Sequence, residues 1–397
     1  MTTHSKRKRA NRLNSKLRQL VSREKQIIGR TNREDIKMYP LLTVDLDHLR
    51  QNVRTVRGLC ASHGVSVTAV TKVFRADPRI AEVLVEEGMS MLGDSRVDNL
   101  ARLEGLNAEK WLIRPPMLSE IENLVRYADA SLNSEMDIVR AISKECIRQN
   151  KKHKVILMAD LGDIREGYVD YDELIEAAVE TDKLPGTELY GIGVNLTCFS
   201  FIQYDTEKLN ELVALRIRVE EAVGHTLQVV SGGNSAAVDL MLRGGIPEGI
   251  NNLRLGESVL FGKERAKYKY LPDTFSDVFT LECEIVELKE KPSLPWGTVG
   301  VDSYGKKPEF TDRGDNRLKA VCALGKQDFD VETTVPCDPG IIVLGASSDH
   351  LMLDLTDSNR SYIVGDTIKL KLGYFSTMRA FTSEYVTRKY KDELNSK

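Results

Sequence analysis

The sequence is poor in cysteine, aromatic residues and long apolar runs. No window holds eighteen or more apolar residues, so no membrane-spanning helix is expected. The N-terminus shows no apolar run followed by a small-residue cleavage site, and we therefore expect a cytoplasmic protein. The six cysteines stand without CxxC spacing or paired histidines, which suits a reducing compartment and argues against structural zinc. No metal is predicted, and most cysteines are expected in the core.

The charge of the chain is unevenly distributed. The 397 residues are 41% hydrophobic and 29% charged, enough for one large core and a smaller second one, so two domains are expected. Residues 1–38 hold twelve Lys and Arg against three acidic residues, a balance of +9, which leaves about -12 for the remainder of a chain of net charge -3. Such a segment can bind nucleic acid, but it lacks interleaved aromatic residues. We expect a basic, partly helical extension that lies on the body of the protein or on a partner chain.

From residue 40 onward, short apolar runs alternate with amphipathic segments, which is typical of repeated βα units. An opening strand, "LLTVDL", comes first. Eight further strand-like runs follow: "VSVTAVTK", "MSMLGD", "KWLIRP", "DASLNS", "KVILMADLG", "LYGIGVNL", "LQVVSGGNS" and "INNLRLGES". Eight units in about 220 residues predict an α/β fold with a closed (β/α)8 TIM barrel over residues 39–274; a doubly wound sheet is the lesser alternative.

Beyond Phe275 the pattern changes to β-rich runs separated by Gly, Pro and Asp clusters, such as "DVFTLECEIVELKEK" and "GIIVLGASSDHLMLDL". This pattern predicts a C-terminal β domain over residues 275–397.

Lys72 ends the first of the eight runs, in "TAVTKVFRADPRI". A lysine in that place is most often the first solvated residue after a strand. In a barrel, however, reactive residues lie at the carboxyl ends of strands, and the loops after the seventh and eighth strands commonly hold phosphate. Those loops read "SGGNSAA", with Asn234 and Ser235, and "NNLRLGES", with Gly256. An amine opposite such an anion cradle indicates pyridoxal 5′-phosphate.

At this point the chain resembles a known family. The motifs "VDLDHLRQNVRTV", "TAVTK", "GDSRVDNL", "GGNSAA" and "LRLGESVLFG" are similar to those of the alanine racemase type of fold III pyridoxal-phosphate enzymes. Within that type, "DLGDIREG", "SGGNS", "NNLRLGE" and "GASSDHLMLDL" resemble the ornithine racemase group. The resemblance covers about residues 40–390. It implies an amino-acid racemase and a head-to-tail homodimer in which each β domain completes the active site of its partner.

The resemblance also implies roles for single residues. Lys72 matches the lysine that binds the cofactor covalently, and Arg165 in "DIREG" matches an arginine that contacts its phenolic oxygen. Arg254 matches the residue that faces the pyridine nitrogen. A guanidinium donates and cannot accept a proton, which favours proton exchange at Cα over decarboxylation or transamination. The alternative is an ordinary salt bridge between Arg254 and Glu257. The predicted cofactor-binding residues are Lys72, Arg165, Asn195, Ser231, Gly233, Asn234, Ser235, Arg254, Gly256 and Glu257.

Racemisation needs a second proton-transfer group on the opposite face of the substrate. The family places a tyrosine in "GYADG" there, supported by a histidine late in the sixth strand. Here the matching stretch is "GKQDFD", with Lys326 at the tyrosine position, and Asn195 stands near the histidine position. The candidates are His350, whose ordinary pKa suits the task, and Lys326. Met158 stands where many relatives have a carbamylated lysine, so no carbamate is expected.

The choice of substrate depends on the charge of the groups that face the site. A cationic side chain requires an acidic group in the site, and Asp328, Asp330 and Asp349 lie in motifs expected to face it. We therefore expect a basic amino acid, ornithine before lysine. The alternatives are a broad-specificity or alanine racemase, a decarboxylase, a non-catalytic protein of pyridoxal-phosphate homeostasis, and a nucleic-acid-binding protein led by its basic segment.

Overall fold

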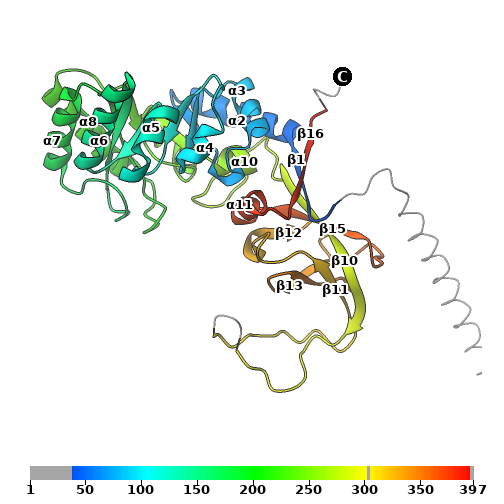
Figure 1. Cartoon of the computed structure of the whole chain (residues 1–397). Helices are drawn as coiled ribbons and strands as arrows, with labels where there is room; N and C mark the ends of the chain where they lie inside the picture. The colour runs from blue at the N-terminus through cyan, green and yellow to red at the C-terminus, as the bar shows by residue number, and fades with distance from the viewer. Residues whose placement is uncertain (1–37, 302–304, 394–397) are drawn as a thin grey trace, which may run out of the picture.

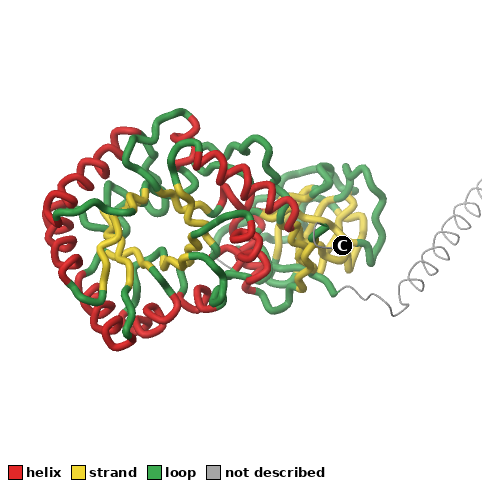
Figure 2. Tube along the Cα trace, turned by 90° about the horizontal axis from the view of Figure 1, so that it is seen from above, coloured by secondary structure: helices red, strands yellow, loops and turns green. Residues whose placement is uncertain are grey.

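A computed structural model describes residues 38–301 and 305–393. The expected basic extension over residues 1–38 lies, except for Met38, outside the described residues. Eight parallel strands close into a barrel, seen as a ring in Figure 2, and this confirms the predicted TIM barrel. The strands are β2 (Ser66–Val70), β3 (Met91–Asp94), β4 (Glu109–Leu112), β5 (Ala130–Asn133), β6 (His153–Ala159), β7 (Thr187–Val194), β8 (Val229–Ser231) and β9 (Asn252–Leu255). Each overlaps one of the eight predicted runs, and β4, β6 and β7 begin one or two residues before their runs.

Helices alternate with these strands and surround the ring. They are α2 (Leu46–Ala61), α3 (Pro78–Glu86), α4 (Val97–Ala101), α5 (Ile121–Tyr127), α6 (Met136–Gln149), α7 (Tyr171–Lys183), α8 (Thr206–Val223), α9 (Ala237–Leu242) and α10 (Glu257–Phe261). Local sequence sets their ends. Asp77 caps α3 ahead of Pro78, which has no amide hydrogen to leave unpaired at that position. Gly224 ends α8 at φ 81°, a conformation that glycine adopts without steric cost.

The barrel interior is a packed core. Trp111, Ala130, Leu132, Ile156, Met158 and Val229 form a buried cluster of their own. Because side chains alternate between the two faces of a strand, the outward-facing residues pack instead against the helices and join the larger core. Closure of the barrel interior leaves the strand ends as the place for a site.

The C-terminal part is an antiparallel β domain, as predicted. Its sheet runs in the order β12 (Thr334–Pro336), β15 (Thr367–Leu372), β10 (Phe279–Lys291), β11 (Arg317–Ala323), β14 (His350–Asp354), β13 (Ile342–Ala346). The opening strand β1 (Leu41–Asp45) pairs antiparallel with β10 and parallel with β16 (Thr387–Lys391). The N-terminal strand, placed in the barrel domain by the predicted boundaries, therefore has its hydrogen-bonded partners in the β domain.

Helix α11 (Tyr374–Thr382) lies between the β domain and the barrel (Figure 1). It packs against the short helix η1 (Lys72–Phe74), where the rings of Phe74 and Phe381 meet edge to face at 6.4 Å. A second short helix, η2 (Leu118–Glu120), precedes α5, and a third, η3 (Val331–Thr333), leads into β12. The β domain therefore reaches the barrel at the strand end that carries Lys72.

Four of the six cysteines are buried, and Cys198 and Cys337 are exposed. Among the described residues, no helix has the length and apolar character needed to cross a membrane. Within the same residues, no group of three or more His, Cys, Asp and Glu side chains is arranged to hold a metal ion.

Candidate active site

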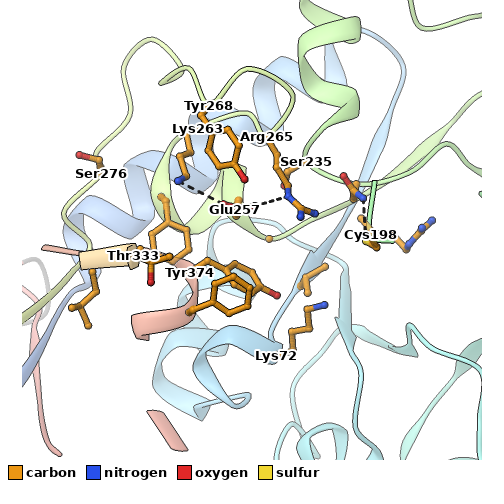
Figure 3. Close-up of a pocket in the computed structure, with 18 of the residues that line it drawn as sticks. Lys72, Cys198, Ser235, Glu257, Lys263, Arg265, Tyr268, Ser276, Thr333 and Tyr374 are labelled. Carbon is orange, nitrogen blue, oxygen red and sulfur yellow. Dashed lines mark hydrogen bonds and ion pairs between the residues drawn. The ribbon is translucent and has the colours of Figure 1, made fainter. Parts of the chain in front are cut away.

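A cavity of about 640 Å³ lies at the carboxyl ends of the barrel strands, against β12 and α11 (Figure 3). Its charged lining is mostly cationic. The six cations are Lys72, Arg165, Arg254, Lys263, Arg265 and Lys371, and the three acids are Glu166, Glu257 and Glu332. The formal excess of three positive charges suits an anionic ligand with several negative oxygens.

Lys72 is half-buried and lines this cavity, so it is not simply the first solvated residue after its strand. The end of β2 just before it is fixed to β3. The Thr71 amide donates to Gly93 O at 2.9 Å, and its hydroxyl donates to Asp94 Oδ2 at 2.7 Å. Asn99 donates to the other oxygen of Asp94 at 3.0 Å. Burial raises the pKa of the Asp94 carboxyl, against the lowering effect of these hydrogen bonds.

The loop after β8 supplies an amide-lined cradle. Asn234 Nδ2 donates to Asn195 Oδ1 at 2.8 Å and to Thr197 Oγ1 at 2.9 Å, which joins it to the loop after β7. Ser235 Oγ accepts from the Ser258 amide at 3.3 Å, at the start of α10. Asn195, Asn234, Ser235 and Gly256 all line the cavity. The structure thus brings together residues predicted from three separate strands.

Ser231 and Gly233 do not line the cavity. Ser231 is fully buried and donates to Asn252 Oδ1 at 2.7 Å. Gly233 has φ 125°, and a Cβ placed there would lie 2.2 Å from the hydroxyl oxygen of Tyr204. Tyr204 is buried, burial raises its pKa to about 12, and its oxygen accepts from the Leu196 amide at 3.2 Å. Ser231 and Gly233, both predicted to contact the cofactor, therefore lie behind the cavity lining, where they support the cradle residues.

Arg254 lines the cavity from β9 and is buried. Its Nη1 donates to Ser231 Oγ at 2.6 Å and its Nη2 donates to Val194 O at 2.9 Å. Burial lowers its pKa, because both of these hydrogen-bond partners are neutral and desolvation outweighs the attraction of nearby groups such as Glu166. The alternative salt bridge with Glu257 is wrong: that carboxylate lies 3.6 Å from Lys263 Nζ and 3.4 Å from Arg265 Nε.

Arg165 also lines the cavity, on the loop after β6. Its guanidinium pairs with Glu166, and its Nε lies 3.9 Å from Asp163 Oδ2. The buried Asp163 accepts from the backbone amides of Cys198, Phe199 and Ser200. One carboxylate therefore ties the Arg165 loop to the loop after β7.

Neither candidate for the second base lines the cavity of its own chain. His350 pairs with Ala323 where β14 meets β11, and the Lys326 amide donates to Ser347 O at 2.9 Å. Both residues thus lie at the same end of the antiparallel β11–β14 pair. The exposed carboxylate of Asp349 accepts from Gln327 Nε2 at 2.7 Å in the same region.

Two of the three acids considered for substrate binding have roles in the fold. The buried Asp328 accepts from the hydroxyl of Ser383 at 2.7 Å. Asp330 caps the helix η3 through the Thr333 amide and lies 3.5 Å from Arg379 Nη2.

Sequence reasoning missed several lining residues: Cys198, Lys263, Arg265, Tyr268, Tyr270, Lys371 and Tyr374. Four cations and two tyrosines in "FGKERAKYKY", shortly after the eighth strand, were the available signal. That run follows α10 and returns to the cradle, because the Arg265 amide donates to Ser235 O at 3.2 Å.

A closed parallel barrel with a lysine at one strand end, facing an anion cradle on two others, defines a (β/α)8-barrel enzyme site. The chain belongs to the family described as alanine racemase, N-terminal domain, which matches residues 44–264. It is a racemase, an isomerase, of that family.

Two curated relatives match nearly the whole described chain. The ornithine racemase of Acetoanaerobium sticklandii is 44% identical over 88% of this chain and 99% of its own length. The lysine racemase of Thermotoga maritima is 36% identical over 90% of this chain and 100% of its own. A crystal structure of alanine racemase from Bartonella henselae, with covalently bound pyridoxal phosphate, shares the fold with a TM-score of 0.66. The two sequences are 17% identical, and the match covers 88% of this chain and 99% of that one.

Proposed function

We propose that the protein is a pyridoxal-phosphate-dependent racemase that interconverts the L and D forms of a basic amino acid, ornithine before lysine. The observation that carries the proposal is Lys72, which lines a cavity with net positive lining next to the Asn234–Ser235 cradle. The similarity to ornithine and lysine racemases supports the choice of substrate.

The residues of the cavity fit the cofactor. Pyridoxal phosphate has an aldehyde for one amine, a phosphate, a phenolic oxygen and a ring nitrogen. Lys72 offers the amine, Asn234 and Ser235 offer polar groups for the phosphate, and Arg165 and Arg254 offer donors for the phenolic oxygen and the ring nitrogen. When bound, the cofactor withdraws electrons from Cα of the amino acid and so makes its proton removable.

This chain supplies one of the two proton-transfer groups directly. In the proposal, the Lys72 amine takes or returns the Cα proton on one face of the substrate. Arg254, held by Ser231 and the Val194 carbonyl, presents a fixed donor that limits electron withdrawal by the ring nitrogen. Proton exchange is then favoured over loss of the carboxylate.

The second group comes, in the proposal, from His350 or Lys326 of the partner subunit in a head-to-tail homodimer. Their position outside the cavity of their own chain supports this arrangement. Apolar residues near the cavity support it as well: Ile164, Phe199 and Phe201 are 68%, 61% and 65% exposed, on the loops that also carry Arg165 and Cys198. Apolar side chains gathered in this way on loops at a site mark an interaction surface.

A basic substrate needs a carboxylate near its side-chain ammonium, because desolvating that charge without a partner is costly. Asp349 fits this role better than Asp328 or Asp330, since it is exposed and adjoins His350. In the same dimer, it would reach the site together with the second base.

The test uses the purified holoenzyme with L-ornithine, L-lysine and L-alanine in deuterium oxide. We expect the D enantiomer of ornithine by chiral chromatography, with deuterium at Cα and no carbon dioxide. Release of carbon dioxide would identify a decarboxylase. No turnover with any of the three, despite bound cofactor, would favour a non-catalytic binding protein.

A further inference from the structure

The segment that follows α10 folds back as a closed hairpin. Lys263 and Tyr270 form an antiparallel bridge, and the Glu264 amide donates to Lys269 O at 2.9 Å. The buried carboxylate of Glu264 accepts from the Lys267 amide at 2.9 Å and from the Lys269 amide at 2.7 Å. The hairpin is therefore held by its own buried acid and by hydrogen bonds along its backbone.

Arg265 stands on this hairpin directly beside the cradle. Its amide donates to Ser235 O at 3.2 Å, so its backbone is attached to the residue that follows Asn234. Figure 3 shows its guanidinium beside Ser235, between Glu257 and Cys198. The side chain lines the cavity, as do Asn234 and Ser235.

Arg265 and Lys263 share a single carboxylate. Glu257 is shared by two cations: its carboxylate lies 3.6 Å from Lys263 Nζ and 3.4 Å from Arg265 Nε. Both distances exceed the roughly 2.7–2.9 Å of a strong charge-assisted hydrogen bond. One carboxylate can neutralise only one of the two cations. The two cations together carry one positive charge more than Glu257, and Arg265 has a neutral hydrogen-bond partner in Tyr268. This excess charge lies beside a cradle whose Asn234 and Ser235 side chains are neutral.

We propose that Arg265 is an ionic ligand of the cofactor phosphate, while Lys263 keeps Glu257 neutralised. The inference rests on the cofactor named in the proposed function, and it adds a charged group to a cradle of otherwise neutral donors. A phosphate that leaves water for a cavity needs a positive partner, and the planar guanidinium offers two parallel donors to its oxygens. A lysine cannot reproduce that geometry.

The test compares two ligands that differ only in the phosphate. Protein stripped of cofactor is titrated with pyridoxal 5′-phosphate and with pyridoxal, and binding is followed by the absorbance change on reaction with Lys72. For Arg265→Gln we expect a loss of about 10- to 100-fold in affinity for pyridoxal phosphate, the range for removing a charged hydrogen-bond partner. Affinity for pyridoxal should change less than about twofold. Arg265→Lys should lose less affinity for pyridoxal phosphate and should likewise keep its affinity for pyridoxal. This variant takes the place of Arg265→Gln in the test if the glutamine variant folds poorly.

Lys263→Gln is the matched control, because it removes a positive charge from the same Glu257 without removing the guanidinium. We expect its affinity for pyridoxal phosphate to fall less than that of Arg265→Gln, because the guanidinium remains although Glu257 then has Arg265 as its remaining cation of the pair. Equal losses for both ligands in Arg265→Gln, or no loss for either, would overturn the inference. A wild-type protein that binds pyridoxal phosphate but racemises nothing would overturn the proposed function and leave the Arg265 comparison decisive. A wild-type protein that binds no pyridoxal phosphate would overturn both.

Discussion

Replacing Gly233 with alanine tests whether the cradle depends on a close approach between the chain and Tyr204. The new Cβ would lie 2.2 Å from the Tyr204 hydroxyl oxygen and 2.4 Å from its Cζ, and Tyr204 is buried and hydrogen-bonded. The backbone at φ 125° is also one that alanine rarely adopts. Backbone strain costs about 1–3 kcal/mol. Overpacking costs about 1–3 kcal/mol more. We expect the free energy of unfolding to fall by about 2–6 kcal/mol, a large part of a typical stability of about 5–15 kcal/mol.

The assay is urea unfolding followed by circular dichroism, together with the affinity for pyridoxal phosphate. Gly224→Ala is the matched control, because Gly224 has φ 81° and no heavy atom within 4 Å of its added Cβ. In Gly224→Ala, the free energy of unfolding should fall only by the amount that backbone strain costs. In a Tyr204→Ala background, Gly233→Ala should cost about 1–3 kcal/mol less than in the wild type, because the steric part is gone. Equal costs in both backgrounds would refute the steric argument. Unchanged cofactor affinity in Gly233→Ala would refute the link to Asn234 and Ser235.

Three further predictions concern the site and the barrel. Borohydride reduction of the holoenzyme, followed by peptide mapping, should place the pyridoxyl group on Lys72; labelling of another lysine would contradict the site. Inactive Lys72→Ala and His350→Ala proteins should regain part of their racemase activity when mixed, because exchanged dimers hold one complete site; exchange without activity would argue against a shared site. Burial lowers the pKa of His153 from 6.5 to about 4, while Ser131 Oγ lies 2.8 Å from its Nε2. The unfolded chain then binds the extra proton first, so the free energy of unfolding should fall by up to about 3 kcal/mol as pH drops from about 6.5 to about 4. His153→Gln should lose this part of the pH dependence. An unchanged pH profile of the free energy of unfolding would refute the role of His153.

The barrel could be predicted because its signal is local. Each strand is a short apolar run followed by a polar loop. Parallel strands buried on both faces can therefore be identified from their own residues, without knowing which strands they pair with. The pairing of β1 with β10 and β16 could not be predicted in this way. Leu41 lies opposite Glu282 and Thr387, hundreds of residues away, and "LLTVDL" does not specify which sheet it joins.

The site was predictable where the fold determines it. Lys72, Asn234 and Ser235 follow strands, so closure of the barrel brings them to one rim. Arg265 and Lys263 were missed because they lie in an irregular hairpin. Its return to the cradle depends on the buried Glu264 and on backbone hydrogen bonds, which have no periodic pattern in the sequence.

Arg254 and Glu257 show how the fold separates residues that the sequence places together. A spacing of three would let them pair if both stood on one helix. Instead, Arg254 lies near the end of β9 and donates to Ser231 on the neighbouring strand β8. Glu257 begins α10, where it faces the Lys263 hairpin. The turn at Gly256 thus places the Arg254 guanidinium at the barrel rim and the Glu257 carboxylate beside the cations of the hairpin. Because Arg254 has neutral hydrogen-bond partners, its charge remains available to a ligand in the cavity, which is the condition that its proposed role at the ring nitrogen requires.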